Sequence, residues 1–152
     1  MHLQHELLID APVERVWALT LDVERWPEAT STMTEVTRLD DGAFGVGSQA
    51  RIKQPAQSDR VWTVTRLDPP TCFEWETSLG PLRLRGGHHL HHAGDACRNR
   101  LTLDVEGFGS KVFGLVAGRS LRKAIATENE GFKRVAEAGD SQDQDAGGVS
   151  TA

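Results

Sequence analysis

The sequence predicts an α+β domain in which a curved, seven-stranded antiparallel sheet wraps around one long C-terminal helix, with two short helices after the first strand. Three observations support this fold class. The chain of 152 residues has the size of one ordinary domain. Extended segments fill its centre and are separated by turn residues at spacings of about ten residues. Helical periodicity is confined to the regions near the two ends of the chain.

The N-terminal part of the chain predicts one strand followed by two short helices. Residues 2–10 form an extended segment, and Asp10 is expected to cap the following helix, with Pro12 in its first turn. One apolar face of this helix is formed by residues at three- and four-residue steps: Val13, Val16, Trp17 and Leu21. A second short helix is expected to start at Asp22 and to stop before Pro27.

The central part of the chain predicts six further strands. The breaks between the later extended runs have strong turn chemistry: Asp68-Pro69-Pro70, Gly80-Pro81 and Ala93-Gly94-Asp95. Such spacing is typical of consecutive antiparallel hairpins. Gly42, Gly45 and Gly47 lie between two strands rather than before a helix, so we interpret them as a hairpin loop and not as a phosphate-binding loop.

The C-terminal part of the chain predicts one long helix, with Ser110 as its N-cap and Gly139 at its end. Its apolar seam recurs at three- and four-residue steps: Phe113, Ala117, Leu121, Ile125, Glu128, Phe132 and Val135. Only this helix is large enough to cover the apolar face of the sheet, and a cavity is expected between the two. Residues 1–138 thus form the predicted domain, and residues 139–152 form an acidic, glycine-containing tail that is expected to be disordered.

This order of elements, together with the segment IDAPVERVWALTLDVERWPE, resembles the START-like helix-grip superfamily (SRPBCC), and within it the bacterial polyketide cyclase/dehydrase group. The resemblance covers about residues 3–138 and is carried by five segments: Ile9 to Trp17, Glu24 to Glu28, Val46 to Ser48 with Arg51, Val61 to Trp75, and the closing helix with Glu128. It implies a helix-grip fold with a cavity for a hydrophobic ligand. Members of the superfamily share this cavity rather than one reaction.

The segment Gly86-Gly87-His88-His89-Leu90-His91-His92 is the densest in groups that could carry chemistry. Alternate residues of a strand share a face. The face predicted to line the cavity comprises Leu82, Leu84, Gly86, His88, Leu90 and His92. A metal site built from His89 and His91, or from His88 and His92, has no obvious acidic or cysteine partner, so we expect solvated or hydrogen-bonded histidines, no metal and no cofactor.

Glu128 occupies a seam position between Ile125 and Phe132, where burying a carboxyl group is costly unless it is paired. A slight rotation of the helix would let it reach solvent or an arginine. Alternatively it meets a polar group in the cavity, with His88 as the first choice, and such a pair would be the acid–base candidate. Arg51 is a weaker candidate because its strand neighbours take the inward positions.

Aromatic residues are expected to point inward from two adjacent strands, either as ordinary core or as cavity lining. Trp26 either caps the core or guards the entrance of the cavity. The predicted ligand-binding residues are Trp26, Trp62, Phe73, Trp75, Leu84, His88, Leu90, Phe113, Ala117, Leu121 and Glu128.

The charge of the chain argues against a nucleic-acid partner. The formal net charge is −5, and three of the acidic residues lie in the predicted tail. A near-neutral body lacks the dense cationic face that phosphate binding needs. Arg119, Arg122 and Lys123 cluster on the last helix, and we interpret them as a solvated face.

The sequence also predicts a cytoplasmic setting. It has no apolar run of about 18 residues that would mark a membrane span, and no signal-peptide pattern at its N-terminus. Cys72 and Cys97 begin two strands that flank a common neighbour, about 9–10 Å apart, which exceeds the reach of a disulfide. We therefore expect free thiols, as in a reducing compartment.

Three functions follow from these patterns. The first is binding of a hydrophobic small molecule, such as a lipid or a polyketide-like compound. The second is a cyclase, aromatase or dehydratase that uses His88 and Glu128. The resemblance implies that tyrosine is a common acid in related cyclases, and this chain has no tyrosine. The third is a protein-interaction or regulatory module, although the sequence shows no exposed apolar stretch in its favour.

Overall fold

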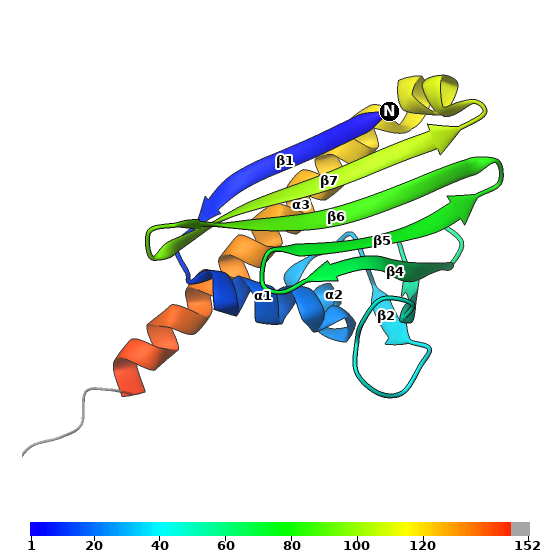
Figure 1. Ribbon diagram of the computed structural model, residues 1–152. Helices are drawn as coiled ribbons and strands as arrows, with labels where there is room; N and C mark the ends of the chain where they lie inside the picture. The colour runs from blue at the N-terminus through cyan, green and yellow to red at the C-terminus, as the bar shows by residue number, and fades with distance from the viewer. Residues whose placement is uncertain (147–152) are drawn as a thin grey trace, which may run out of the picture.

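The computed structural model describes residues 1–146, with side chains described for residues 1–139 (Figure 1). It opens with strand β1 (His2–Ile9), helix α1 (Val13–Leu21), the short 3-10 helix η1 (Val23–Arg25) and helix α2 (Trp26–Ala29). Six strands follow: β2 (Glu35–Arg38), β3 (Gln49–Lys53), β4 (Arg60–Asp68), β5 (Cys72–Leu79), β6 (Leu82–Ala93) and β7 (Ala96–Gly107). The last element is helix α3 (Ser110–Ala146).

All seven strands form one antiparallel sheet in the order β1-β7-β6-β5-β4-β3-β2. Strands β2 to β7 pair with their neighbours in sequence. Strand β1 pairs with β7, so β1 and β2 are the two edge strands of the sheet. In Figure 1, α3 runs behind the sheet, and α1 and α2 lie together at one end of it. The predicted fold class is confirmed: a seven-stranded antiparallel sheet with a long C-terminal helix and short helices after the first strand.

Alternation along the strands buries one face of the sheet. On β3, Ala50 and Ile52 are buried while Arg51 between them is exposed. On β7, the buried apolar residues again lie two apart: Leu101, Leu103 and Val105. This regular alternation gives the sheet a continuous apolar surface, which must be covered by other elements.

The boundaries of the short helices differ from the expected ones at two places. Asp10 does not cap α1, because Pro12 occupies the N-cap position and Asp10 lies too early to reach the first turn. The amide of Asp10 donates instead to Oε1 of Glu137 at 2.9 Å. The second short helix does not stop before Pro27. This proline lies in the first turn of α2, where its missing N–H leaves no helical hydrogen bond unmade.

Helix α3 begins at Ser110 as expected, but it does not end at Gly139 and continues to Ala146. A glycine inside a helix costs about 1 kcal/mol relative to alanine, which weakens the helix without ending it. The last part of the predicted tail, residues 147–152, lies outside the described residues. No helix in the described part of the chain is long and apolar enough to cross a membrane.

Two buried asparagines fasten α3 to the sheet. Asn99 on β7 and Asn129 on α3 have no exposed surface, and Nδ2 of Asn99 donates to Oδ1 of Asn129 at 2.9 Å. Nδ2 of Asn129 donates to the main-chain oxygens of Asn99 at 3.0 Å and of His5 at 3.1 Å. These bonds fix the position of α3 over β1 and β7, and with it the width of the space between helix and sheet.

We expect Asn129→Ala to lower the free energy of unfolding by about 2–3 kcal/mol, because it leaves buried polar groups of Asn99 and His5 without partners. Urea denaturation followed by circular dichroism measures the change. The control is Glu130→Ala, an exposed neighbour on the same helix, which should change stability by no more than about 0.5 kcal/mol. Equal stabilities of the two variants would contradict the structural role of the asparagine pair.

Candidate functional site

A cavity of about 410 Å³ lies between the sheet and α3. Its sheet side is lined by apolar side chains of β3 to β7: Ile52, Trp62, Trp75, Leu84, Leu101 and Leu103. Its helix side is lined by Phe113, Ala117, Ser120, Leu121, Ala124 and Ile125, and Glu128 follows further along α3. The volume falls within the range of about 300–1,000 Å³ that is typical of small-molecule sites.

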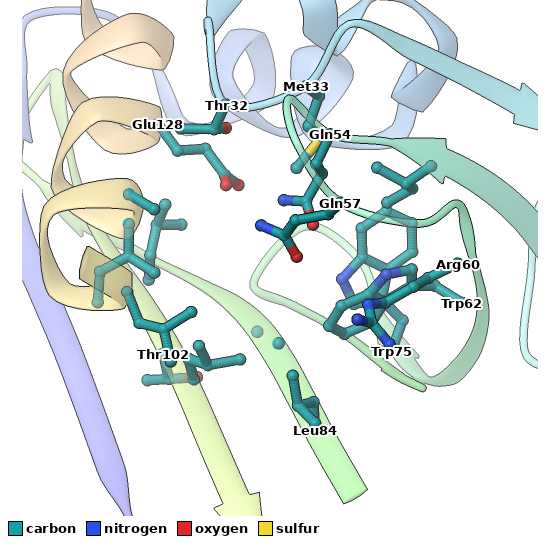
Figure 2. Close-up of a pocket in the computed structure, with 18 of the residues that line it drawn as sticks. Thr32, Met33, Gln54, Gln57, Arg60, Trp62, Trp75, Leu84, Thr102 and Glu128 are labelled. Atoms are coloured by element: carbon teal, nitrogen blue, oxygen red, sulfur yellow. The ribbon is translucent and has the colours of Figure 1, made fainter. Parts of the chain in front are cut away.

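The remaining wall of the cavity comes from connecting segments. Residues 32–33 precede β2, Gln54 and Gln57 belong to the β3–β4 connection, and Arg60 begins β4. In Figure 2 the amide groups of Gln54 and Gln57 lie between Glu128 on one side of the cavity and Trp62 and Arg60 on the other. The sequence carries no local signal for these residues, because the path of a loop over a sheet is not encoded in a periodic pattern. Leu101 and Leu103, by contrast, alternate with polar residues on β7, and this signal could have identified them.

Most of the residues predicted to bind ligand line the cavity: Trp26, Trp62, Trp75, Leu84, His88, Phe113, Ala117, Leu121 and Glu128. Phe73 and Leu90 do not. Both are fully buried in the core next to the cavity, where the rings of Trp26 and Phe132 occupy the space between sheet and helix. Strand alternation identifies the inward face correctly, but it does not show where along that face the cavity ends.

His88 and Glu128 meet at the inner end of the cavity. Nε2 of His88 lies 3.2 Å from Oε1 of Glu128, and the two side chains are 4% and 14% exposed. The imidazole packs among aromatic rings, with centroid distances of 5.0 Å to Trp26 and 5.2 Å to Phe132. Its other nitrogen, Nδ1, is buried and has no hydrogen-bond partner among the described residues. A histidine in contact with a carboxyl group in such surroundings can take a proton from a bound molecule or give one to it.

The carboxyl group of Glu128 does not lie in solvent or against an arginine, the alternative that the sequence leaves open, because it contacts His88. The weaker candidate Arg51 is exposed on β3 and does not line the cavity. The cationic side chain that borders the cavity is Arg60, on the neighbouring strand.

Trp26 belongs to the inner wall of the cavity and not to its entrance. It is 2% exposed, and its Nε1 donates to the main-chain oxygen of Leu19 at 3.1 Å. Its ring lies 5.0 Å from that of Trp75 and 6.1 Å from that of Phe73. The structure therefore agrees with a core cap and disagrees with the entrance role.

Trp62 and Trp75 form an aromatic wall in which the two rings are tilted against each other, with centroids 5.4 Å apart and an interplanar angle of 37°. Both indoles lie over Gly86 of β6, where a Cβ would be 3.0 Å from Nε1 of Trp75 and 3.6 Å from Cζ3 of Trp62. The glycine therefore gives the indoles room to lie against the sheet. In Figure 2 the two rings and Arg60 are grouped on the side of the cavity opposite Glu128.

Comparison with known proteins agrees with this architecture. Residues 1–137 match the model of a family described as "Polyketide cyclase / dehydrase and lipid transport". The chain belongs to this family. A curated relative from Streptomyces cyaneus, named "Putative polyketide cyclase", is 36% identical over 62 residues. The aligned stretch covers 41% of this chain and 40% of the relative, so it spans less than half of either protein.

Solved structures show the same fold over almost the whole chain. A protein from Thermus thermophilus has a TM-score of 0.74 at 18% identity, covering 91% of this chain and 99% of that one. Norcoclaurine synthase from Thalictrum flavum has a TM-score of 0.70 at 13% identity, covering 89% and 85%. The Zhui aromatase/cyclase from a Streptomyces species has a TM-score of 0.66 at 21% identity, covering 91% and 98%. Similarity at these identities establishes the fold of this family member and not its reaction.

On the opposite face of the sheet, three groups that could hold a metal ion lie within 4.8 Å of one another: Cys72, Glu74 and His89. Nη1 of Arg66 lies 3.7 Å from Oε1 of Glu74, and this positive charge disfavours a second cation beside the carboxyl group. The combination of His88 with His92 does not form a site. His88 faces the cavity, and four residues of extended strand place His92 about 13 Å further along β6.

Cys72 and Cys97 are free, as predicted, and both are buried. They lie on β5 and β7, the two neighbours of β6. Burial raises the pKa of each thiol to about 11, and the nearby charge of Glu74 adds to the effect at Cys72. Both thiols are therefore protonated at neutral pH and react slowly as nucleophiles.

We expect the stability of the protein to fall as the pH rises from about 9 to about 11. In the unfolded chain the thiols lose their protons near pH 9.0, whereas in the folded chain they keep them up to about pH 11, so alkaline pH favours unfolding. Because the chain has no tyrosine, lysine is the other side chain that titrates in this window. Urea midpoints at about pH 8 and about pH 10.5 should differ less in a Cys72→Ala/Cys97→Ala variant than in the wild type. An equal alkaline loss in both proteins would mean that the thiols contribute nothing to it.

Proposed function

We propose that this protein binds a hydrophobic small molecule, lipid-like or polyketide-like, in the cavity between the sheet and α3. The observation that carries the proposal is the lining of the cavity, which is mostly apolar and aromatic. Its polar groups include the contact between His88 and Glu128 at the inner end. Burying apolar ligand surface supplies the main favourable free energy of binding. The few polar groups then orient the ligand.

The arrangement favours a ligand with a flat apolar body and at least one oxygen. Trp62 and Trp75 each offer the face of an indole ring against which such a body can stack. Glu128 and His88 are placed to meet an oxygen at the inner end. Arg60, which lies across the cavity from Glu128 in Figure 2, can meet a second oxygen. The description of the family names polyketide cyclases and lipid transport, which supports the same two ligand classes.

Titration with two probes, followed by tryptophan fluorescence, tests this proposal. Saturable binding of 1-naphthol would indicate a polyketide-like ligand, and saturable binding of oleate a lipid-like one. Ala124→Phe fills the cavity and should raise the Kd about tenfold or more. Ala138→Phe, at an exposed position of the same helix, is the matched control and should bind like the wild type. Binding of neither probe, or equal affinities of the two variants, would overturn the proposal.

The contact between His88 and Glu128 favours a second candidate function, a cyclase, aromatase or dehydratase-type enzyme. In the dehydration of a β-hydroxy carbonyl compound, one member of the pair removes the proton from the carbon next to the carbonyl. The electron pair forms the C=C bond as the hydroxyl leaves, and the other member protonates that hydroxyl, which departs as water. The names of the Streptomyces cyaneus relative and of the Zhui aromatase/cyclase support this candidate.

The probe 3-hydroxy-1-tetralone separates the two functions, because it becomes 1-naphthol when it loses water. An enzyme should form 1-naphthol catalytically, and His88→Ala should abolish this turnover while Arg51→Ala, an exposed position outside the cavity, should not. Saturable binding without any formation of 1-naphthol would reject the dehydratase and leave the binding function standing.

A further inference from the structure

Large apolar side chains stand exposed at the start of α3. Phe108, Val112, Leu115 and Val116 are 91%, 65%, 88% and 82% exposed. The last three lie on one side of the first turns of α3, and Phe108 lies in the turn before it. We call these four residues the apolar patch. The sequence does not reveal the apolar patch, because apolar residues lie on more than one side of the first turns of α3. From the sequence alone, the exposed ones cannot be distinguished from those that form a buried seam.

A basic segment adjoins the apolar patch. Lys111, Arg119, Arg122 and Lys123 are all exposed on the first half of α3. Residues 107–127 contain no acidic residue, although the chain as a whole carries a net charge of −5. The solvated basic face that the sequence predicts is thus one part of a combined surface. We call these four bases, together with the apolar patch, the α3 outer surface.

The α3 outer surface lies beside the open end of the cavity. The opposite side of the same helical turns lines the cavity through Phe113, Ala117 and Leu121, which are only half-buried. His88, at the inner end, is buried. In Figure 1 the start of α3, drawn in yellow, lies at the end of the sheet away from α1. Whatever covers the α3 outer surface therefore lies next to the opening of the cavity.

We propose that the α3 outer surface docks onto an anionic lipid bilayer. The apolar patch would enter the boundary between headgroups and acyl chains, and the basic side chains would contact lipid phosphates. A large exposed apolar surface next to basic residues is the combination that such interfacial binding requires. The proposed docking depends only on this surface. The purpose of the docking would be to load or release a lipid-soluble ligand at the cavity opening, and that part rests on the proposed function.

Two features favour a bilayer over a protein partner. In a symmetric contact between two copies, the same surface is used twice, so eight basic side chains and no acidic ones from residues 107–127 would be brought together and would repel one another. The four apolar side chains also project outward, and none of them lines the cavity. A fluid bilayer adapts to projecting side chains, whereas a protein needs a complementary groove.

Vesicle flotation of the full chain tests the docking. We expect binding to phosphatidylcholine vesicles that contain about 30% phosphatidylglycerol, with little binding to pure phosphatidylcholine and with loss of binding at high salt. Leu115→Asp/Val116→Asp should lower the bound fraction about tenfold, and Arg119→Glu/Lys123→Glu should lower it as well. The matched control is Val46→Asp, which changes an apolar residue that is 68% exposed but lies between β2 and β3, and it should bind like the wild type.

Two results would overturn the docking proposal. One is equal vesicle binding by the α3 variants and the Val46 control. The other is a wild-type dimer in sedimentation velocity that Leu115→Asp/Val116→Asp dissociates, with no vesicle binding by the wild type. Titration with 1-naphthol keeps the two proposals apart. An α3 variant that binds 1-naphthol but not vesicles supports docking, whereas a wild type that binds vesicles but neither 1-naphthol nor oleate contradicts only the proposed function.

Discussion

Replacing Gly131 with alanine is expected to lower the free energy of unfolding by about 3 kcal/mol. Gly131 lies where α3 passes the end of α2, and a Cβ there would be 1.9 Å from the main-chain oxygen of Ala29. Nη2 of Arg134 donates to the same oxygen at 3.0 Å, so the backbone at Ala29 is held in place. Alanine must therefore push α2 away from α3.

This displacement should also weaken ligand binding, because α2 carries Trp26. The ring of Trp26 lies 5.5 Å from that of Phe132 and 5.0 Å from that of His88. Moving it opens the inner wall of the cavity. Urea denaturation and titration with 1-naphthol measure the two effects on the same variant.

Gly139→Ala is the matched control for Gly131→Ala on the same helix. The nearest atom to a Cβ at Gly139 is Cδ of Arg15 at 3.7 Å, which is an ordinary contact. Alanine should be neutral there or stabilise the helix by up to about 1 kcal/mol. If the two glycine substitutions had the same effect, the close passage of α3 over Ala29 would be contradicted.

Replacing Glu128 with alanine is expected to raise the Kd for 1-naphthol about tenfold and to leave the Kd for naphthalene within about twofold. Glu128 is the carboxyl group at the inner end of the cavity, and without it both the ligand hydroxyl and His88 lose a polar partner. Naphthalene has the same rings and no hydroxyl, so it reports only on the apolar lining. Glu130→Ala, at an exposed position of α3, should change neither Kd.

The outcome of this comparison separates polar recognition from a change of shape. Equal weakening of both probes would mean that Glu128 acts only by shaping the cavity. An unchanged Kd for 1-naphthol would contradict its role as a polar partner. If the cavity also catalyses dehydration, Glu128→Ala should lower the turnover of 3-hydroxy-1-tetralone by about 10²–10⁴-fold.

The parts of the site that follow a regular period could be predicted from the sequence. The two-residue period of β5 and β6 placed Trp75, Leu84 and His88 on the inner face. The helical period of the C-terminal segment placed Phe113 and Glu128 on the same seam of α3. The sequence allows the pairing of His88 with Glu128 as one of two arrangements, because a period fixes the face of an element but not its position along its neighbour.

The parts that depend on packing between elements could not be predicted in this way. Phe73 and Leu90 lie on the predicted face, but both are buried in the core, where the ring of Trp26 packs against Phe73. Gln57 enters the lining because a loop passes over the cavity. The exposed side of the first turns of α3 was also hidden, since an apolar residue carries the same pattern whether a neighbour covers it or not.

The cavity beneath α3 is proposed to be a ligand site. The most direct test is the ¹H–¹⁵N spectrum of the tryptophan indoles during titration with 1-naphthol. Trp62 and Trp75 line the cavity, whereas Trp17 is buried in the core outside it and serves as an internal control. We predict saturable shifts of the Trp62 and Trp75 signals with no shift of the Trp17 signal. Unchanged Trp62 and Trp75 signals at saturating 1-naphthol would contradict a ligand site in this cavity.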